Sequence, residues 1–230
     1  MAVAITEPVA EVASTANAST YASGSFTPTA DSLLVVIAFA TSTNNGVITG
    51  GGLTWTNRFF DGSGTSVALI ATAQVGGAPG SMTVTFDCTG DAATGCAFTV
   101  FQVTGHNASV PLAQASTGLS SFGTGATPAV TLAAARNTLN AYMAGAFNVT
   151  NPAGIAQPSG WTETADTGYS TPTIGMETAF RAGGETSATI TWGGVSASAG
   201  SAFAIEINEA SLPAAPTTVP NSLMMMGCGT

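Results

Sequence analysis

Basic residues are scarce in this chain. It has no lysine and only three arginines, against twelve Asp and Glu residues, for a net charge of −9 over 230 residues. A protein that binds a nucleic acid backbone displaces condensed counterions with several Lys or Arg side chains, so nucleic acid is excluded as a partner. An anionic membrane surface requires the same kind of basic cluster and is excluded on the same ground.

Charge of either sign is scarce as well, and so are long apolar runs. Charged residues make up 7% of the chain, whereas an ordinary soluble domain has roughly 25%. No run of about 18 apolar residues occurs, which argues against a transmembrane helix. The hydrophobic content of 45% is too high for a disordered chain. Thr favours strands while Gly and Ser favour turns, and these residues are abundant, so the composition predicts an all-β fold.

Alternating residues predict individual strands. Met82, Val84 and Phe86 alternate with threonines, and Ile190 and Trp192 do so in a later segment. This period of two is typical of a strand with one apolar face, and we expect these five side chains to face a core.

Three other strands carry further expectations. The segment 33–40 is apolar on both faces, which predicts a central strand covered on its second side by a loop or a neighbouring subunit. In the last strand, Phe203 should face the core and Glu206 the solvent. Glu177 and Arg181 share one face of another strand, and we expect them to form a solvent-facing pair of little energetic value.

The chain is also similar to itself at a spacing of about 105 residues. Segments recur in the same order, paired as 33–40 with 138–147, 52–56 with 159–163, 71–77 with 178–184, 82–86 with 188–192, and 98–103 with 203–208. We therefore expect an antiparallel β-sandwich, jelly-roll-like, over residues 26–209, with pseudo-repeats at about 26–112 and 113–209. A single sandwich with interleaved halves is favoured over two smaller sandwiches in tandem, because one half alone has little core.

The two ends differ from this body. Residues 1–25 predict an extended arm, in which Val3 and Ile5 are candidate contacts with a partner. Residues 210–230 contain spaced prolines that favour extended chain. Flexible Met side chains fill irregular grooves, so the tail could dock on a neighbouring subunit, or it could lack fixed structure. The candidate contacts in the tail are Leu223, Met224, Met225 and Met226.

Residues with the potential for chemistry form no known motif. Cys88 and Cys96 flank a short loop and either close a disulfide or remain two buried thiols. Three cysteines with one histidine match no common zinc spacing, so neither a metal nor another cofactor is expected. His106 follows a strand without the Gly-x-Ser-x-Gly turn of a serine hydrolase, and a phosphate-binding loop requires lysine. No pair of acids stands out as glycosidase carboxylates. We expect a protein that is not an enzyme.

Trp55, Trp161 and Tyr169 are candidates for stacking on a sugar ring. Trp55 and Trp161 occupy equivalent places in the repeat, which favours structural anchors at the edge of the sandwich. Trp192 corresponds to the inward Phe86. Core packing is therefore favoured over a glycan platform for the tryptophans.

The repeated pattern resembles β-sandwich proteins of tailed-phage virions over roughly residues 26–208. It is carried by Gly160-Trp-Thr-Glu163, 177–186, 188–192 and 202–207. The resemblance implies a capsid decoration (cement) protein or a fibre component, with the major capsid protein or other virion subunits as partners and a homo-oligomeric state. The alternative is a glycan-binding or adhesive module of a fibre or cell-surface protein. The first residues lack the pattern of a secretory signal, so we expect synthesis in the host cytoplasm and a place on the capsid surface.

Overall fold

The computed structural model describes residues 2–41, 43–62, 66–133, 137–148, 155–170, 173–196 and 198–210, without the side chains of 165–170, 173 and 174. Every regular element in these ranges is a β-strand, and none of the described residues forms a helix that could cross a membrane. The strand pairs are antiparallel throughout. The predicted all-β, antiparallel, sandwich-like fold is confirmed.

The first half of the chain forms a six-stranded sheet and a three-stranded sheet. The large sheet has the order β1-β9-β4-β7-β6, with β2 also paired to β9, and the small sheet has the order β3-β8-β5. The bounds are β1 Ala4–Thr6, β2 Val12–Ser14, β3 Thr20–Ala22, β4 Leu33–Thr41, β5 Val47–Thr49, β6 Thr56–Asp61, β7 Ser66–Gln74, β8 Thr85–Asp87 and β9 Gly95–Thr104.

The second half repeats this plan. Its large sheet has the order β10-β17-β13-β15-β14, with β11 also paired to β17, and its small sheet is β12-β16. The bounds are β10 Leu112–Ala115, β11 Ser120–Phe122, β12 Ala129–Thr131, β13 Ala141–Asn148, β14 Thr162–Ser170, β15 Thr173–Arg181, β16 Thr189–Thr191 and β17 Gly200–Ile207. Each strand of the second half therefore has a counterpart in the first, and β5 is the strand without one in the described part.

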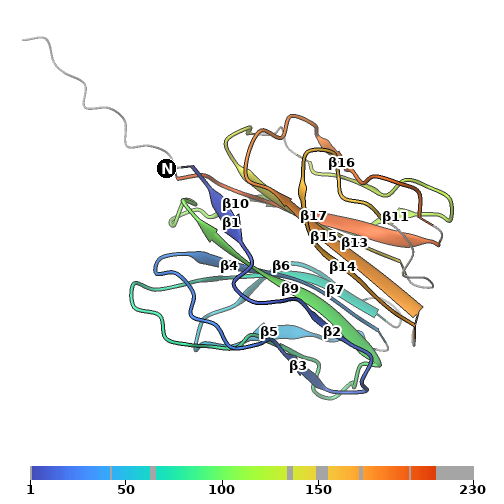
Figure 1. Cartoon of the computed structure of the whole chain (residues 1–230), viewed down its shortest axis with the longest axis horizontal. Coiled ribbons are helices and arrows are strands. Elements are labelled where there is room, and N and C mark those ends of the chain that lie inside the picture. Colours follow the sequence, from blue (N-terminus) through green and yellow to red (C-terminus); the bar gives the residue numbers. More distant parts are fainter. Residues whose placement is uncertain are drawn as a thin grey trace, which may run out of the picture.

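The two halves do not interleave, so the favoured single sandwich is wrong. Each half closes its own sandwich, and the two large sheets then pack face to face, as Figure 1 shows with the first half below and the second above. Three apolar cores result: one inside each sandwich and one between the large sheets. One half has little core inside its own sandwich, but its large sheet also buries its second face in the middle core.

Stacked aromatic pairs join the two halves across the middle core. Phe39 of β4 stacks on Phe147 of β13, with ring centroids 4.0 Å apart. Phe59 stacks on Phe203 at 5.1 Å. The predicted central strand β4 is thus covered on its second side by the other half of the same chain, where a loop or a neighbouring subunit was expected.

The N-terminal segment is part of the body, which corrects the expected arm. β1 and β2 pair with β9, and β3 pairs with β8. Val3 and Ile5 are buried in the middle core and are therefore unavailable as contacts with a partner. Because β1–β3 correspond to β10–β12, the repeat unit begins before residue 26.

The repeat alignment of the last strands is wrong by one residue. In the two large sheets, Leu33 pairs with Val103 and Ala141 with Ile207, so Val103 corresponds to Ile207. A shift of one residue turns a strand's side chains to the opposite face. Accordingly, Phe98 faces the core of the first sandwich, whereas Phe203 faces the middle core.

Candidate functional site

A pocket of about 230 Å³ opens on the second sandwich. It lies between the segment before β14, the turn after β15, and β16. Its lining combines an aromatic ring, an arginine, a carboxylate and several hydroxyl groups, contributed by Pro158, Ser159, Trp161, Arg181, Glu185, Ser187, Thr189, Ile190 and Thr191. This is the one place among the described pockets where an ionisable pair and a tryptophan meet.

Glu185 organises one wall of this pocket. Its Oε2 accepts hydrogen bonds from Trp161 Nε1 at 2.9 Å and Arg181 Nη1 at 3.3 Å. Its Oε1 accepts from the backbone N–H groups of Thr186 at 2.9 Å and Ser187 at 2.8 Å. Burial raises the pKa of Glu185, but these hydrogen bonds and the Arg181 charge outweigh it, and the pKa lies below its ordinary value. The carboxylate is therefore ionised at neutral pH and fixed in place.

Arg181 is held from two sides and still reaches solvent. Its Nε donates to the carbonyl of Gly183 at 3.0 Å, and its side chain is 29% exposed. Gly184 makes the turn with φ of +77°, a conformation that favours glycine, and so brings Glu185 back to Arg181. A guanidinium has five N–H donors, and the two bonds described leave donors for a ligand.

Among the described residues, no strand pairs with the edge of β16 next to the pocket. In the first half, β8 pairs with β5 over three residues, Val47 to Thr49. In the second half, the corresponding contact among the described residues is a single bridge between Ala156 and Gly193. Pro158 would continue this pairing opposite Thr191, but proline has no N–H to donate. The chain therefore leaves the sheet, and the pocket occupies the space.

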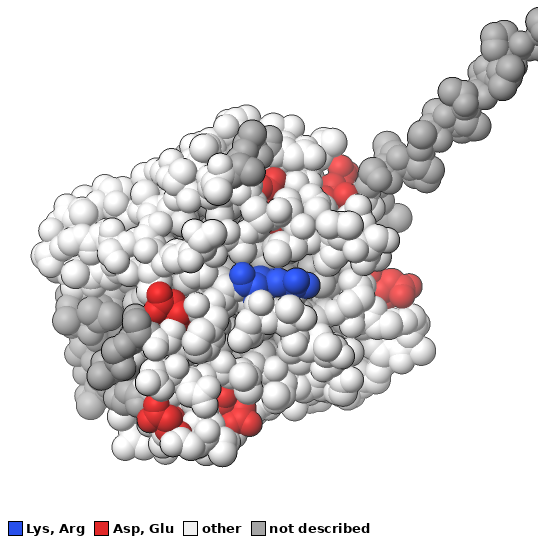
Figure 2. All heavy atoms as spheres, turned by 180° about the vertical axis from the view of Figure 1, so that it is seen from behind, with Lys and Arg blue, Asp and Glu red and all other residues white. Residues whose placement is uncertain are grey.

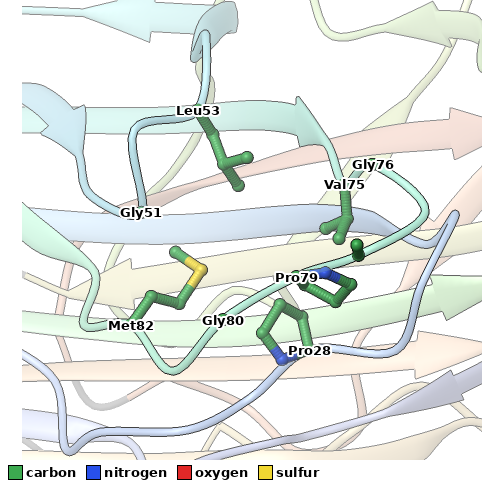
Figure 3. A pocket seen from close by; sticks show the side chains of 9 residues that line it. Pro28, Gly51, Leu53, Val75, Gly76, Pro79, Gly80 and Met82 are labelled. Carbon is green, nitrogen blue, oxygen red and sulfur yellow. The ribbon is translucent and has the colours of Figure 1, made fainter.

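The first half has a smaller pocket of about 170 Å³ in the matching place, lined by glycines and apolar side chains. Figure 3 shows Leu53, Val75, Pro28 and Met82 gathered around it. No ionisable side chain lines it. Thr56 pairs with Thr72 and Thr162 with Phe180, so the residue that corresponds to Arg181 is Ala73. The predicted alignment of 71–77 with 178–184 is therefore also wrong by one residue. The ion pair is therefore a property of the second half alone.

The structure supports core packing, the favoured role of the tryptophans, over the alternative of a sugar-stacking platform. Trp161 is 7% exposed and presents little ring surface, while Trp55 is half-buried and donates from Nε1 to the Gly50 carbonyl at 3.2 Å. The side chain of Tyr169 lies outside the described residues. Trp192 is buried in the core of the second sandwich, as predicted.

A second buried carboxylate, Glu206, corrects the expectation that it faces solvent. It is 1% exposed and accepts hydrogen bonds from Tyr142 Oη at 2.7 Å, Asn140 Nδ2 at 2.9 Å and the backbone N–H of Asn137 at 3.3 Å. Gln114 Nε2 also donates to it. Burial raises the pKa of Glu206, but these bonds together hold the pKa below its ordinary value. The group anchors β10 and the turn before β13 to β17.

Glu177 also departs from expectation. It is 1% exposed, so the predicted solvent-facing pair with Arg181 is wrong. Arg181 instead pairs with Glu185 across the turn.

His106 lies where the two halves join. Its Nε2 lies 2.9 Å from Gln74 Oε1, and its backbone forms a bridge with Glu209. Burial lowers the pKa of His106, and the nearby backbone of Val103 offsets part of this effect. A neutral, buried imidazole that ties chain segments together is the role these contacts support.

Two sets of predicted site residues remain, the cysteines and the apolar residues of the tail. Cys88 and Cys96 are buried free thiols in the first sandwich, the second of the two alternatives left open by the sequence. Leu223, Met224, Met225 and Met226 lie outside the described residues.

Little in the sequence indicates the pocket. Arg181 and Glu185 are four residues apart, but the strand pattern paired Arg181 with Glu177, and only recognition of the Gly183–Gly184 turn would have corrected this. Comparisons of the chain with protein-family models, with curated proteins and with solved structures found no match.

Proposed function

We propose that the chain is a virion structural protein, a decoration protein on the outer surface of a phage head that binds neighbouring capsid subunits as a homo-oligomer. The main support for the proposal is that the surface carries few charged residues. Charged residues make up 7% of the chain, and Figure 2 shows a face on which a basic group and scattered acidic groups interrupt a largely uncharged surface. Charged residues are depleted at the centre of protein interfaces, so such a surface can be covered by neighbours at low desolvation cost.

The way the chain uses its buried polar groups also supports a structural role. Glu206, Glu185 and His106 each hold segments of the chain together through hydrogen bonds. The middle core fuses two sandwiches into one body. A body of this kind keeps its shape while neighbours bind to it, which is what an assembly component requires.

One edge strand of each large sheet, β6 and β14, is irregular in a way that hinders pairing with another chain. β6 carries a bulge between Asn57 and Phe59, and β14 carries one between Glu163 and Ala165. Bulges of this kind disrupt the ladder that another strand would extend. In this proposal the specific contacts with partners lie on the sandwich faces and on residues 211–230, which lie outside the described residues.

Co-sedimentation tests this proposal. Purified full chain is mixed with phage particles that lack it, and bound protein is measured against concentration. We expect saturable binding, and we expect a variant with Leu223 and Met224–226 replaced by Ser to bind at least tenfold more weakly. Replacement of Thr217 and Thr218 by Ser is the matched tail control and should leave binding unchanged. Failure of the full chain to bind any particle would contradict the decoration role.

A glycan-binding role is the alternative function. The pocket at Trp161 and Arg181 favours it, because its lining combines polar donors with an apolar wall. The two roles are compatible in one chain, since the pocket uses a small part of the surface.

A further inference from the structure

The pocket at Trp161, Arg181 and Glu185 offers both donors and acceptors of hydrogen bonds. Backbone bonds join Trp192 to Pro128 and Leu132 to Ala188, and Ile190 pairs with Val130 between them. Hydrogen-bonded pairs alternate in an antiparallel ladder. The N–H and C=O groups of residues 189 and 191 therefore point toward the open edge of β16.

These two residues differ in what remains free for a ligand. The backbone groups of Thr189 are already bonded by the hydroxyl of Ser187, at 3.1 Å for the N–H and 2.7 Å for the C=O. Thr191 has no such partner in the described part of the chain. Its backbone pair, the spare donors of Arg181 and the hydroxyl of Ser159 thus line one small space.

The pocket is close to neutral in charge. Glu185 lies 3.3 Å from Arg181 and compensates it. Both Glu185 oxygens already accept hydrogen bonds, so they are poorly placed to bind a cation. The net charge of −9 repels anions at long range. An uncharged ligand fits this balance better than an ion.

The size of the pocket and its apolar wall restrict the class of ligand further. The volume of about 230 Å³ is below the roughly 300–1,000 Å³ of sites that enclose drug-sized molecules. Pro158, Ile190 and the edge of Trp161 supply apolar surface beside the polar groups. A sugar ring has the matching character, because its hydroxyl groups both donate and accept while its C–H face is apolar.

We infer that this pocket binds an uncharged sugar ring, such as the terminal residue of a glycan. The inference rests on the alternative function, glycan binding, and deepens it by naming the class of ligand and the residues that bind it; it does not depend on the decoration role. Arg181 and Thr191 are the specificity-determining groups, and Glu185 acts through Arg181 as a positioning residue. Specificity of this kind arises because a ligand without the matching hydroxyls leaves these polar groups unpaired.

A peptide strand added to β16 is the rival occupant. Strand addition relies on a run of main-chain hydrogen bonds. Within the described ranges, this edge offers one residue with free backbone groups, Thr191, since Ser187 already bonds Thr189. The geometry therefore favours a compact ligand over a strand.

Saturation-transfer NMR on the full chain tests the inference. The probes are glucose, galactose, mannose and N-acetylglucosamine, with N-acetylneuraminic acid and glucosamine as charged comparators and an uncharged Thr/Val hexapeptide as the rival. Ser159→Phe fills the pocket without removing a member of the Glu185 network. Leu53→Phe, at the corresponding position of the first half, is the matched control. Arg181→Ala gives the second half the residue that the first half has at this position.

We expect at least one uncharged sugar to bind the wild-type chain and the Leu53→Phe variant equally. Ser159→Phe should abolish the signal, and Arg181→Ala should weaken binding about tenfold, the effect of losing one hydrogen bond to a charged group. The inference is overturned if no uncharged sugar binds at millimolar concentration, if the charged sugars or the peptide bind instead, or if Ser159→Phe leaves binding intact. Particle binding is measured separately, so failure here leaves the decoration proposal standing.

Discussion

Replacing Phe147 by Ala tests whether the middle core holds the two sandwiches together as one body. Phe147 is 3% exposed, its ring stacks on Phe39 at 4.0 Å, and it lies 6.3 Å from the ring of Phe203. Removing a buried Phe side chain costs about 3–5 kcal/mol through lost burial and the cavity left behind. The stacked pair adds about 0.5–1.5 kcal/mol beyond burial, which a double-mutant cycle with Phe39→Ala isolates.

Urea unfolding followed by tryptophan fluorescence and circular dichroism measures this effect. Trp55 reports on the first sandwich, and Trp192 on the second. Because the large sheets share the middle core, we expect the wild-type chain to show one unfolding transition, at the same urea concentration by fluorescence and by circular dichroism. For Phe147→Ala, we expect the midpoints by both methods to move together to lower urea. Leu139→Ala is the control, since Leu139 is 62% exposed, and it should change stability by no more than about 0.5 kcal/mol.

Two outcomes would refute this reasoning. A loss of less than about 1 kcal/mol for Phe147→Ala would show that the stacked ring contributes little, against the usual cost of such a truncation. Separate transitions of the two sandwiches in the wild-type chain would show that the middle core does not couple them.

Other predictions concern buried groups in each core. Glu206→Gln should cost about 1–3 kcal/mol at pH 7, because an amide cannot accept from all the donors around it; denaturant midpoints at several pH values measure this. The folded-state pKa of Glu206 is depressed, so its contribution to the free energy of unfolding is present above about pH 4.5 and is lost as pH falls through the folded pKa. The difference in stability between wild type and Glu206→Gln should therefore shrink at low pH, and an unchanged difference at pH 3 would contradict this. Gly145→Ala should cost about 1–3 kcal/mol by overpacking, since a Cβ there would lie 2.9 Å from Ile37 Cγ2, and a thermal midpoint equal to that of the wild type would count against the close approach. Cys88 and Cys96 should react with a thiol reagent only after unfolding, as peptide mass spectrometry would show; labelling in the native state would mean that the first core opens.

The sequence predicted well those strands that have one buried face. Met82, Val84 and Phe86 all face the first core, and Ile190 and Trp192 the second, because strict alternation leaves one choice of face. The repeat was also recognisable, and its strands pair in the same order in both halves.

The pattern failed where both faces of a strand are buried. β9 and β17 have apolar residues on both faces, so the sequences match about equally well when one is shifted by one residue. The pattern therefore could not show that the alignment of Val103 with Asn208 is wrong. For the same reason, the pattern wrongly predicted that Glu206 faces solvent. A buried acid is recognised by its partners, here Asn140 and Tyr142, and these lie far from it in the sequence.

The N-terminal strands and the pocket were missed for a different reason. β1 to β3 are three residues each, too short to show a period. The pocket arises from what the second half lacks relative to the first, a three-residue pairing interrupted at Pro158, together with an arginine where the first half has Ala73. Such differences between repeats become meaningful only once the register of the strands is known.

The most direct test of the account is to measure how much of the chain purified virions contain. Particles are separated from free protein by density gradient, and the chain is quantified against the major capsid protein by mass spectrometry with labelled reference peptides. An outer-surface decoration protein should be present at a fixed copy number per capsid subunit and should be accessible to antibodies on intact particles. Recovery of the chain only in the free fractions, with none on the particles, would contradict the account.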